Sequence, residues 1–190
     1  MDVREPSQFA LGHPLGALSV PYSPRGLSDR LHTIYIPTLP VVIIARNTEQ
    51  AEDVGNQLES GSFSVLGVIA GGMESWLANN LPFQTITEIE AAAISTAMSK
   101  QPCVVLDVRE PMEWEMGHVP GAILISLGEL GNRLNEIPSK SPVIVICEAG
   151  VRSSSAASML QAYGLEEVIN VPDGTAGYRN GNLPLEFYKE

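Results

Sequence analysis

Residues 143–158 read Val-Ile-Val-Ile-Cys-Glu-Ala-Gly-Val-Arg-Ser-Ser-Ser-Ala-Ala-Ser, and this stretch decides how the chain folds. Its first four residues are apolar and β-branched, which is typical of a strand that is buried on both faces. A short loop containing Gly150 follows, and helix-tolerant residues then continue to Gly164, which ends the helix. We therefore predict a strand, a loop and a helix, with Cys147 where the strand ends.

The position of Cys147 favours chemistry over core packing. The first amides of a helix have no partner within the helix, and the amides of a preceding loop can join them to form a nest that holds an anion. A thiolate at Cys147 would lie over this nest, so we predict that Cys147 is a nucleophile. We expect Glu148 to point to solvent, because its charge would oppose the thiolate. Arg152 opposes the helix dipole, so an anionic substrate is the predicted reason for its presence.

Composition limits the class of protein. The 190 residues allow one or two domains, and a hydrophobic content of 44% is enough for a core. The net charge of −11 argues against nucleic acid and membrane as partners. The N-terminus has no signal-peptide pattern, and the two cysteines lie in different predicted strands, so we expect a reducing cytoplasm. Two cysteines and three scattered histidines predict no metal site, and we expect no cofactor.

The beginning of the chain is repeated in its second half. Residues 2–6, Asp-Val-Arg-Glu-Pro, recur as residues 107–111, an offset of 105 (107 − 2). The apolar run 41–45 matches 143–147, an offset of 102 (147 − 45). The two offsets differ by three residues, which indicates a length change between residues 17 and 41 and the corresponding stretch. Glycines and prolines that recur at a constant offset on each side of this change indicate a tandem duplication. We therefore predict one domain over residues 1–83 and a second over residues 84–190.

Both repeats alternate strands with helices, which predicts a mostly parallel sheet covered by helices on both faces. Ligands of such sheets bind at the carboxyl ends of the strands, where Cys147 is predicted to lie. A capping box at Thr87 and Glu90 predicts a helix that continues through Ala97. The other predicted strands are residues 18–21, 41–45, 63–68, 103–108, 123–126 and 168–171, and the other predicted helices are residues 27–31, 51–58, 73–77, 111–116 and 127–135.

Three motifs of the second repeat resemble the rhodanese (sulfurtransferase) family. They are Asp-Val-Arg-Glu at 107–110, Gly-His-Val-Pro-Gly-Ala at 117–122, and the loop Cys-x-x-Gly-x-Arg-Ser at 147–153, in the family's order and spacing. The first repeat looks like another rhodanese domain. The resemblance implies an α/β fold with two tandem rhodanese-like domains, each a mostly parallel central sheet flanked by helices.

The resemblance also implies the site. The loop cysteine of that family takes a sulfane sulfur from a donor, becomes a persulfide and passes the sulfur to a nucleophilic acceptor. On this implication Cys147 is the catalytic residue, and Asp107 and Arg109 steady the loop. His118 and Cys103 are interpreted as structural residues. The implied substrate-binding residues are Glu148, Ala149, Gly150, Val151, Arg152 and Ser153.

The first repeat is predicted to be inactive. Ala45 stands in place of the loop cysteine, and Glu49 and Gln50 stand in place of the loop glycine and arginine. No persulfide can form without a thiol. Met1 aligns with Leu106, so we expect the first copy to be N-terminally incomplete, without counterparts of residues 86–105.

We expect a sulfurtransferase that moves sulfur from thiosulfate or a related persulfide donor to a thiol or protein acceptor. Glu148 replaces a lysine of some thiosulfate-using relatives, which keeps a persulfide donor open. One alternative is a non-enzymatic persulfide carrier or docking module. Another is a cysteine phosphatase or arsenate reductase, although the loop of the related phosphatases is one residue longer. A homodimer is also left open.

Overall fold

The computed structural model describes residues 1–34 and 40–187, which form two compact units, Met1–Thr85 and Ile86–Glu190. The units meet two residues after the predicted domain boundary (85 against 83). The reason is that β4 (Phe83–Gln84) pairs antiparallel with β1 (His13–Pro14), which keeps residues 83–84 in the first unit. No helix in the described part of the chain is long and apolar enough to cross a bilayer.

The second unit is built on a parallel five-stranded sheet, which confirms the α/β prediction. Its central strand β8 (Val143–Ile146) is buried along its whole length, as predicted for a strand covered on both faces. The register places Asp107, at the end of one neighbouring strand, opposite Ile146. The strand order is β5 (Thr87–Glu88), β9 (Val168–Asn170), β8, β6 (Val104–Asp107) and β7 (Ile123–Leu124).

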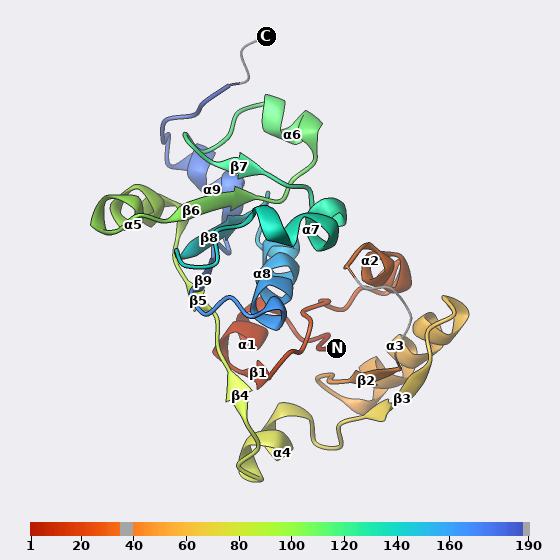
Figure 1. Ribbon diagram of the computed structural model, residues 1–190. Coiled ribbons are helices and arrows are strands. Elements are labelled where there is room, and N and C mark those ends of the chain that lie inside the picture. Colours follow the sequence, from red (N-terminus) through yellow and green to blue (C-terminus); the bar gives the residue numbers. More distant parts are fainter. Residues whose placement is uncertain (35–39, 188–190) are drawn as a thin grey trace. The chain divides into compact units, whose positions relative to one another are not determined.

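Helices cover both faces of this sheet (Figure 1). Ile144 and Ile146 pack with Ala91, Ile94 and Tyr178 on one side. Successive strand residues face opposite sides, so β8 turns its other two residues towards α8, which packs on β8, β9 and α7. The helices are η1 (Ala91–Ala93), α5 (Ile94–Lys100), α6 (Pro111–Glu115), α7 (Leu127–Arg133), η2 (Leu134–Glu136), α8 (Val151–Tyr163) and α9 (Gly174–Asn180).

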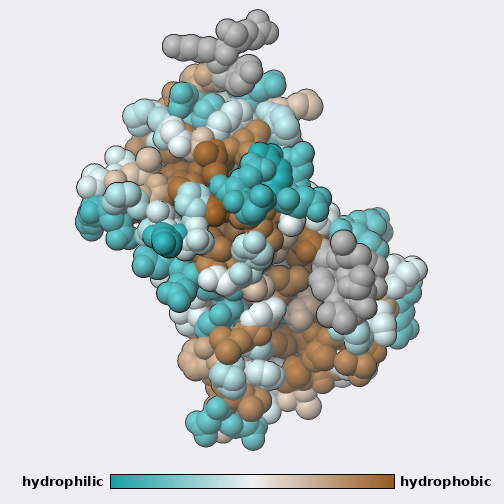
Figure 2. Space-filling model, in the orientation of Figure 1, coloured by the Kyte–Doolittle hydropathy of each residue, from teal (hydrophilic) through white to brown (hydrophobic). Residues whose placement is uncertain are grey.

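The outer side of α7 is hydrophilic (Figure 2). Arg133 forms exposed ion pairs there with Glu129 at 3.0 Å and Glu136 at 2.8 Å. Exposed pairs of this kind contribute little to stability. The Arg109–Asp107 and Arg152–Glu113 pairs, which are described below, are less exposed.

The start of the second unit differs from the prediction. Thr87 does not cap a helix, because Thr87 and Glu88 form β5 and pair with Ile169 and Asn170 of β9. The helical segment begins after Glu90 instead, where Asp173 accepts a hydrogen bond from the Ala91 amide at 2.9 Å. A long-range strand pairing therefore overrides the local capping signal. The next strand begins one residue later than predicted, so that Cys103 is only half-buried.

The first unit contains a parallel strand pair, β2 (Val41–Ile43) and β3 (Val65–Val68). Asp2 adds isolated bridges to Ser19 and Ile44 on either side. The strand predicted over residues 18–21 is reduced to the first of these bridges, although the Val20 and Tyr22 amides still donate to the carbonyls of Asp2 and Val3 at 2.9 Å. The helices of this unit are α1 (Pro6–Leu11), α2 (Leu27–Ile34), α3 (Thr48–Ser60) and α4 (Gly72–Ala78).

Candidate active site

Cys147 lies between the end of β8 and the start of α8, as predicted. Its side chain is 1% exposed, and its thiol donates to Ser153 Oγ at 3.5 Å. The Ser153 hydroxyl in turn donates to the Gly150 carbonyl at 3.1 Å. The helix begins at Val151 and ends at Gly164, whose φ of +105° is the left-handed cap expected there. The sulfur is therefore held at the first turn of a 13-residue helix.

Two glycines set the shape of the loop. Gly150 has a φ of +82°, and a Cβ there would collide with the Pro172 carbonyl oxygen. Gly174 at the start of α9 has a φ of +58°, and a Cβ there would collide with the carbonyl oxygens of Cys147 and Glu148. Both positions need a left-handed backbone and close approach, which only glycine provides without strain. The loop is thereby pressed against the segment that leads from β9 into α9.

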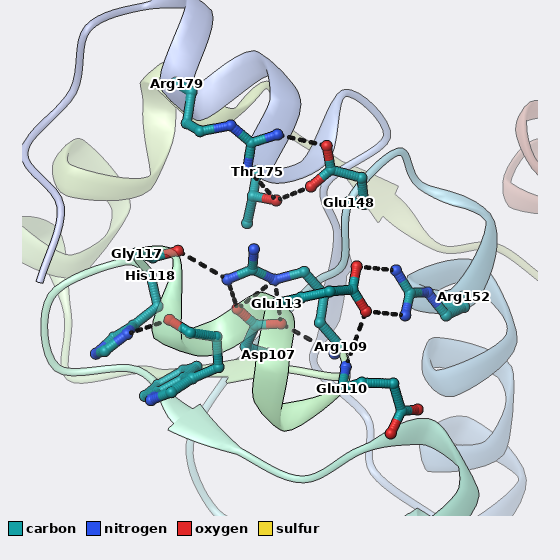
Figure 3. A network of polar contacts seen from close by, with 11 residues as sticks. Asp107, Arg109, Glu110, Glu113, Gly117, His118, Glu148, Arg152, Thr175 and Arg179 are labelled. Carbon is teal, nitrogen blue, oxygen red and sulfur yellow. Dashed lines mark hydrogen bonds and ion pairs between the residues drawn. The ribbon is translucent and has the colours of Figure 1, made fainter. Parts of the chain in front are cut away.

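Glu148 does not simply point to solvent, which corrects the prediction. Its carboxylate accepts a short hydrogen bond from Arg179 and another from Thr175 Oγ1 at 2.7 Å (Figure 3). The Arg179 guanidinium holds the pKa of Glu148 below its usual value. The negative charge next to Cys147 is therefore balanced by a cation from α9.

Arg152 is bound by Glu113 of α6, a residue that was not among the predicted site residues. The two terminal nitrogens of Arg152 donate to the two carboxylate oxygens of Glu113 at 2.6 and 2.7 Å. Glu113 also accepts the Glu110 amide at 3.0 Å in a capping box. The signal for it was present in the sequence, because a Glu at the third position of a helix that starts with Pro111 is a capping residue.

The pairing of Glu113 with Arg152 predicts an unusual titration. The arginine lowers the pKa of Glu113 to about 2, from a usual value of 4.5. A lowered folded-state pKa stabilises the fold above pH 4.5 and loses this contribution as the pH falls towards 2. A ¹³C NMR titration should find the Glu113 carboxyl still ionised at about pH 3.5, and Arg152→Gln should move its midpoint up towards 4.5. A wild-type midpoint near 4.5 would contradict the pairing.

Asp107 and Arg109 form a buried pair beside the loop. Arg109 donates to both Asp107 oxygens and, through Nη2, to the Gly117 carbonyl at 3.0 Å. These bonds tie the end of β6 to the segment at Gly117, and support of the cysteine loop by this pair stays a prediction. His118 stacks on Trp114 with ring centroids 3.4 Å apart, and its Nδ1 lies 3.2 Å from the Trp114 carbonyl. Both contacts join His118 to Trp114 within the fold.

The first unit repeats this set of contacts. Arg4 donates to both Asp2 oxygens and to the Gly12 carbonyl, and His13 stacks on Phe9 at 3.7 Å. Gly72 has a φ of +55° and approaches the Ala45 carbonyl, as Gly174 approaches that of Cys147. The Asp–Arg pair, the histidine stack and the left-handed glycine thus occur in both units, in the second with Cys147 and in the first with Ala45.

The structure brings the remaining predicted residues together in one loop, with Ala149 and Val151 exposed and Gly150 and Ser153 buried. Within residues 1–34 and 40–187, no group of three His, Cys, Asp or Glu side chains is placed to hold a metal ion. The loop offers a thiol, backbone amide donors and two ion pairs, Arg152 with Glu113 and Glu148 with Arg179.

Comparisons with known proteins show which family the second unit resembles. Residues 90–180 match the Rhodanese-like domain family. The chain is 30% identical over 86 residues to the thiosulfate sulfurtransferase GlpE of Pseudoalteromonas translucida, in a match that covers 45% of this chain and 82% of that protein. A rhodanese-related protein from Thermoplasma volcanium superposes with a TM-score of 0.50 at 28% identity, covering 54% of this chain and 99% of that one. The chain belongs to the rhodanese family.

A further relative is the "Putative sulfur carrier protein YrkF" of Bacillus subtilis, which is 38% identical over 91 residues. The match covers 47% of this chain and 49% of that protein. The chain therefore spans about half the length of this curated relative. Both curated matches extend over about 90 residues, as does the family match over residues 90–180.

Proposed function

We propose that this protein is a sulfurtransferase that carries a sulfane sulfur as a persulfide on Cys147. The observation that carries the proposal is the position of this thiol, at the carboxyl end of the central strand and directly before the amides that open α8. Relatives named as a thiosulfate sulfurtransferase and a sulfur carrier support the same class of chemistry. The substrates are then a sulfur donor and a thiophilic acceptor.

The transfer runs in two displacements. The Cys147 thiolate attacks the outer sulfur of thiosulfate, the donor S–S bond breaks, and sulfite leaves with the electron pair. A nucleophilic acceptor such as cyanide or a thiol then attacks the outer sulfur of the persulfide, and the Cys147 thiolate is regenerated. Amides of residues 148–152 serve to stabilise the anionic persulfide, and the Ser153 hydroxyl can add a hydrogen bond once it turns from the Gly150 carbonyl to the sulfur. An S–S bond of about 2 Å projects the reactive sulfur outward from the buried Sγ.

We extend the proposal to the first unit, as a second rhodanese-like domain without activity, so that the units Met1–Thr85 and Ile86–Glu190 are two such domains in tandem. Ala45 follows β2 and precedes α3, as Cys147 follows β8 and precedes α8. The repeated Asp–Arg pair, the histidine stack and the left-handed glycine support this interpretation. An alanine methyl cannot accept sulfur, so transfer is assigned to the second domain alone.

Intact-protein mass spectrometry tests the proposal. After incubation with thiosulfate or an alkyl persulfide, the wild type should gain one sulfur atom, and cyanide should remove it. Cys103→Ala keeps the candidate nucleophile and should behave like the wild type, whereas Cys147→Ala keeps only Cys103 and should gain nothing. Sulfur gain by Cys147→Ala, or no gain by the wild type from either donor, would overturn the proposal. Turnover to thiocyanate distinguishes an enzyme from a carrier that loads once.

A further inference from the structure

Arg152, the cation of the cysteine loop, is already bound by a carboxylate. Both terminal nitrogens of Arg152 point at the two oxygens of Glu113, with bonds of 2.6 and 2.7 Å (Figure 3). This fork-to-fork geometry is the one in which a guanidinium binds a carboxylate or another oxyanion most strongly. Each side chain of the pair is 31% exposed, so the pair lies at the edge of the site rather than in the core. An incoming oxyanion would have to displace a bonded carboxylate.

The other charges around the loop are balanced as well. Glu148 is paired with Arg179, and Asp107 with Arg109. Together with the Glu113–Arg152 pair, these groups sum to zero. Glu110, which precedes α6, is exposed and adds a negative charge. The described site therefore has no surplus cation to attract a dianion, in a chain whose net charge is −11.

The first unit shows that the Glu113–Arg152 pair is separable from the fold. At the offset of 105 Gln8 stands in place of Glu113, and at the offset of 102 Gln50 stands in place of Arg152. Gln8 still serves the capping box of α1, and Gln50 accepts the Arg46 amide at 2.8 Å. Capping and loop contacts thus survive with neutral side chains, while the ion pair is absent together with the thiol.

We propose that Glu113 determines donor specificity by occupying Arg152, so that the site favours a sulfane sulfur carried on an uncharged alkyl group over thiosulfate. The inference rests on the function proposed above and deepens it. With an alkyl persulfide, the Cys147 thiolate attacks the outer sulfur, the S–S bond breaks, and the alkyl thiolate leaves with the electron pair. That donor carries no sulfonate oxygens that need the guanidinium. Thiosulfate carries sulfonate oxygens that need the Arg152 guanidinium, but the Glu113 carboxylate is already bound there.

Steady-state kinetics with two donors test this assignment. Glu113→Gln should lower the KM for thiosulfate about tenfold, equivalent to about 1.4 kcal/mol, because it frees one face of Arg152 and removes a repelling charge. The KM for hydroxyethyl persulfide, which has no sulfonate or carboxylate, should stay within about twofold of wild type. The kcat values should change little, because the substitution leaves the Cys147 thiol and the backbone amides of its loop in place. Glu115→Gln, an equal charge change at an exposed position of the same helix, should alter neither KM.

The outcomes separate the two proposals. An unchanged or higher KM for thiosulfate in Glu113→Gln, or an equal fall for both donors, overturns the specificity role while persulfide formation at Cys147 still stands. Absence of a Cys147 persulfide from either donor in the wild type removes the proposed function and this inference with it. Glu113→Asp keeps the charge on a shorter side chain, and its thiosulfate KM should lie between those of wild type and Glu113→Gln. The same order should appear in thiosulfate loading followed by mass spectrometry.

Discussion

Asp107→Asn is expected to destabilise the second unit by about 3–5 kcal/mol, because it leaves a buried guanidinium without its counter-charge. Arg109 is 1% exposed and Asp107 is fully buried. Three hydrogen bonds from the Arg109 side chain end on the Asp107 carboxylate. Asparagine preserves the shape and one acceptor oxygen, so the loss reports the charge and the second acceptor. Water cannot reach the guanidinium to replace them.

Urea unfolding measures this effect separately in each unit, since the chain has one tryptophan in each. Trp114 reports the second unit in a Trp76→Phe background. The matched control is Asp2→Asn, followed through Trp76 in a Trp114→Phe background. Arg4 is 11% exposed and can recover some hydration, so this control should lose less stability. An Asp107→Asn loss no larger than that of Asp2→Asn would contradict the argument from burial.

Gly174→Ala is expected to cost about 2–5 kcal/mol and to impair persulfide formation at Cys147. The left-handed φ of +58° contributes about 1–2 kcal/mol for a residue with a Cβ. Overlap of that Cβ with the carbonyl oxygens of Cys147 and Glu148 adds about 1–3 kcal/mol of packing strain. The strain can be relieved only by moving the loop that holds the thiol, so activity should fall together with stability.

Gly121→Ala measures separately the free-energy cost of placing a Cβ on a left-handed backbone. Gly121 has a φ of +74°, but a Cβ at this position would meet no neighbouring atom within 4 Å. Only the conformational cost of about 1–2 kcal/mol should appear, with normal sulfur loading. Equal losses of stability and equal loading in the two variants would show that the contact with the Cys147 carbonyl has no effect.

The central part of the fold was predictable because its signals are local. The β-branched run before Cys147, the glycine at 150 and the stop at Gly164 correctly predicted β8, the loop and α8. The duplicated motifs likewise predicted α6, with its early proline. These segments carry their own turn and period signals, so no knowledge of distant partners was needed.

The sequence-based predictions failed where a residue far along the chain determines the local structure. Thr87 looks locally like a cap, but Glu88 of β5 pairs with Asn170 of β9, which lies 82 positions further along the chain. Glu148 was expected in solvent because its charge would oppose the thiolate. Arg179, which lies in another helix and binds this carboxylate, could not be placed beside it from sequence. Glu113 was missed for the same reason, since its bond to Arg152 joins residues 39 positions apart.

The duplicated framework has a consequence for how such sequences are interpreted. The Asp–Arg fork, the stacked histidine and the left-handed glycine occur here both with a thiol and without one. A motif search based on those residues therefore retrieves scaffolds, whether or not they are reactive. Under the function proposed above, reactivity depends instead on the positions held by Cys147, Glu113 and Arg152 in one half and by alanine and two glutamines in the other. Under that proposal these three positions, rather than the longer motifs, distinguish a copy that can form a persulfide from one that cannot.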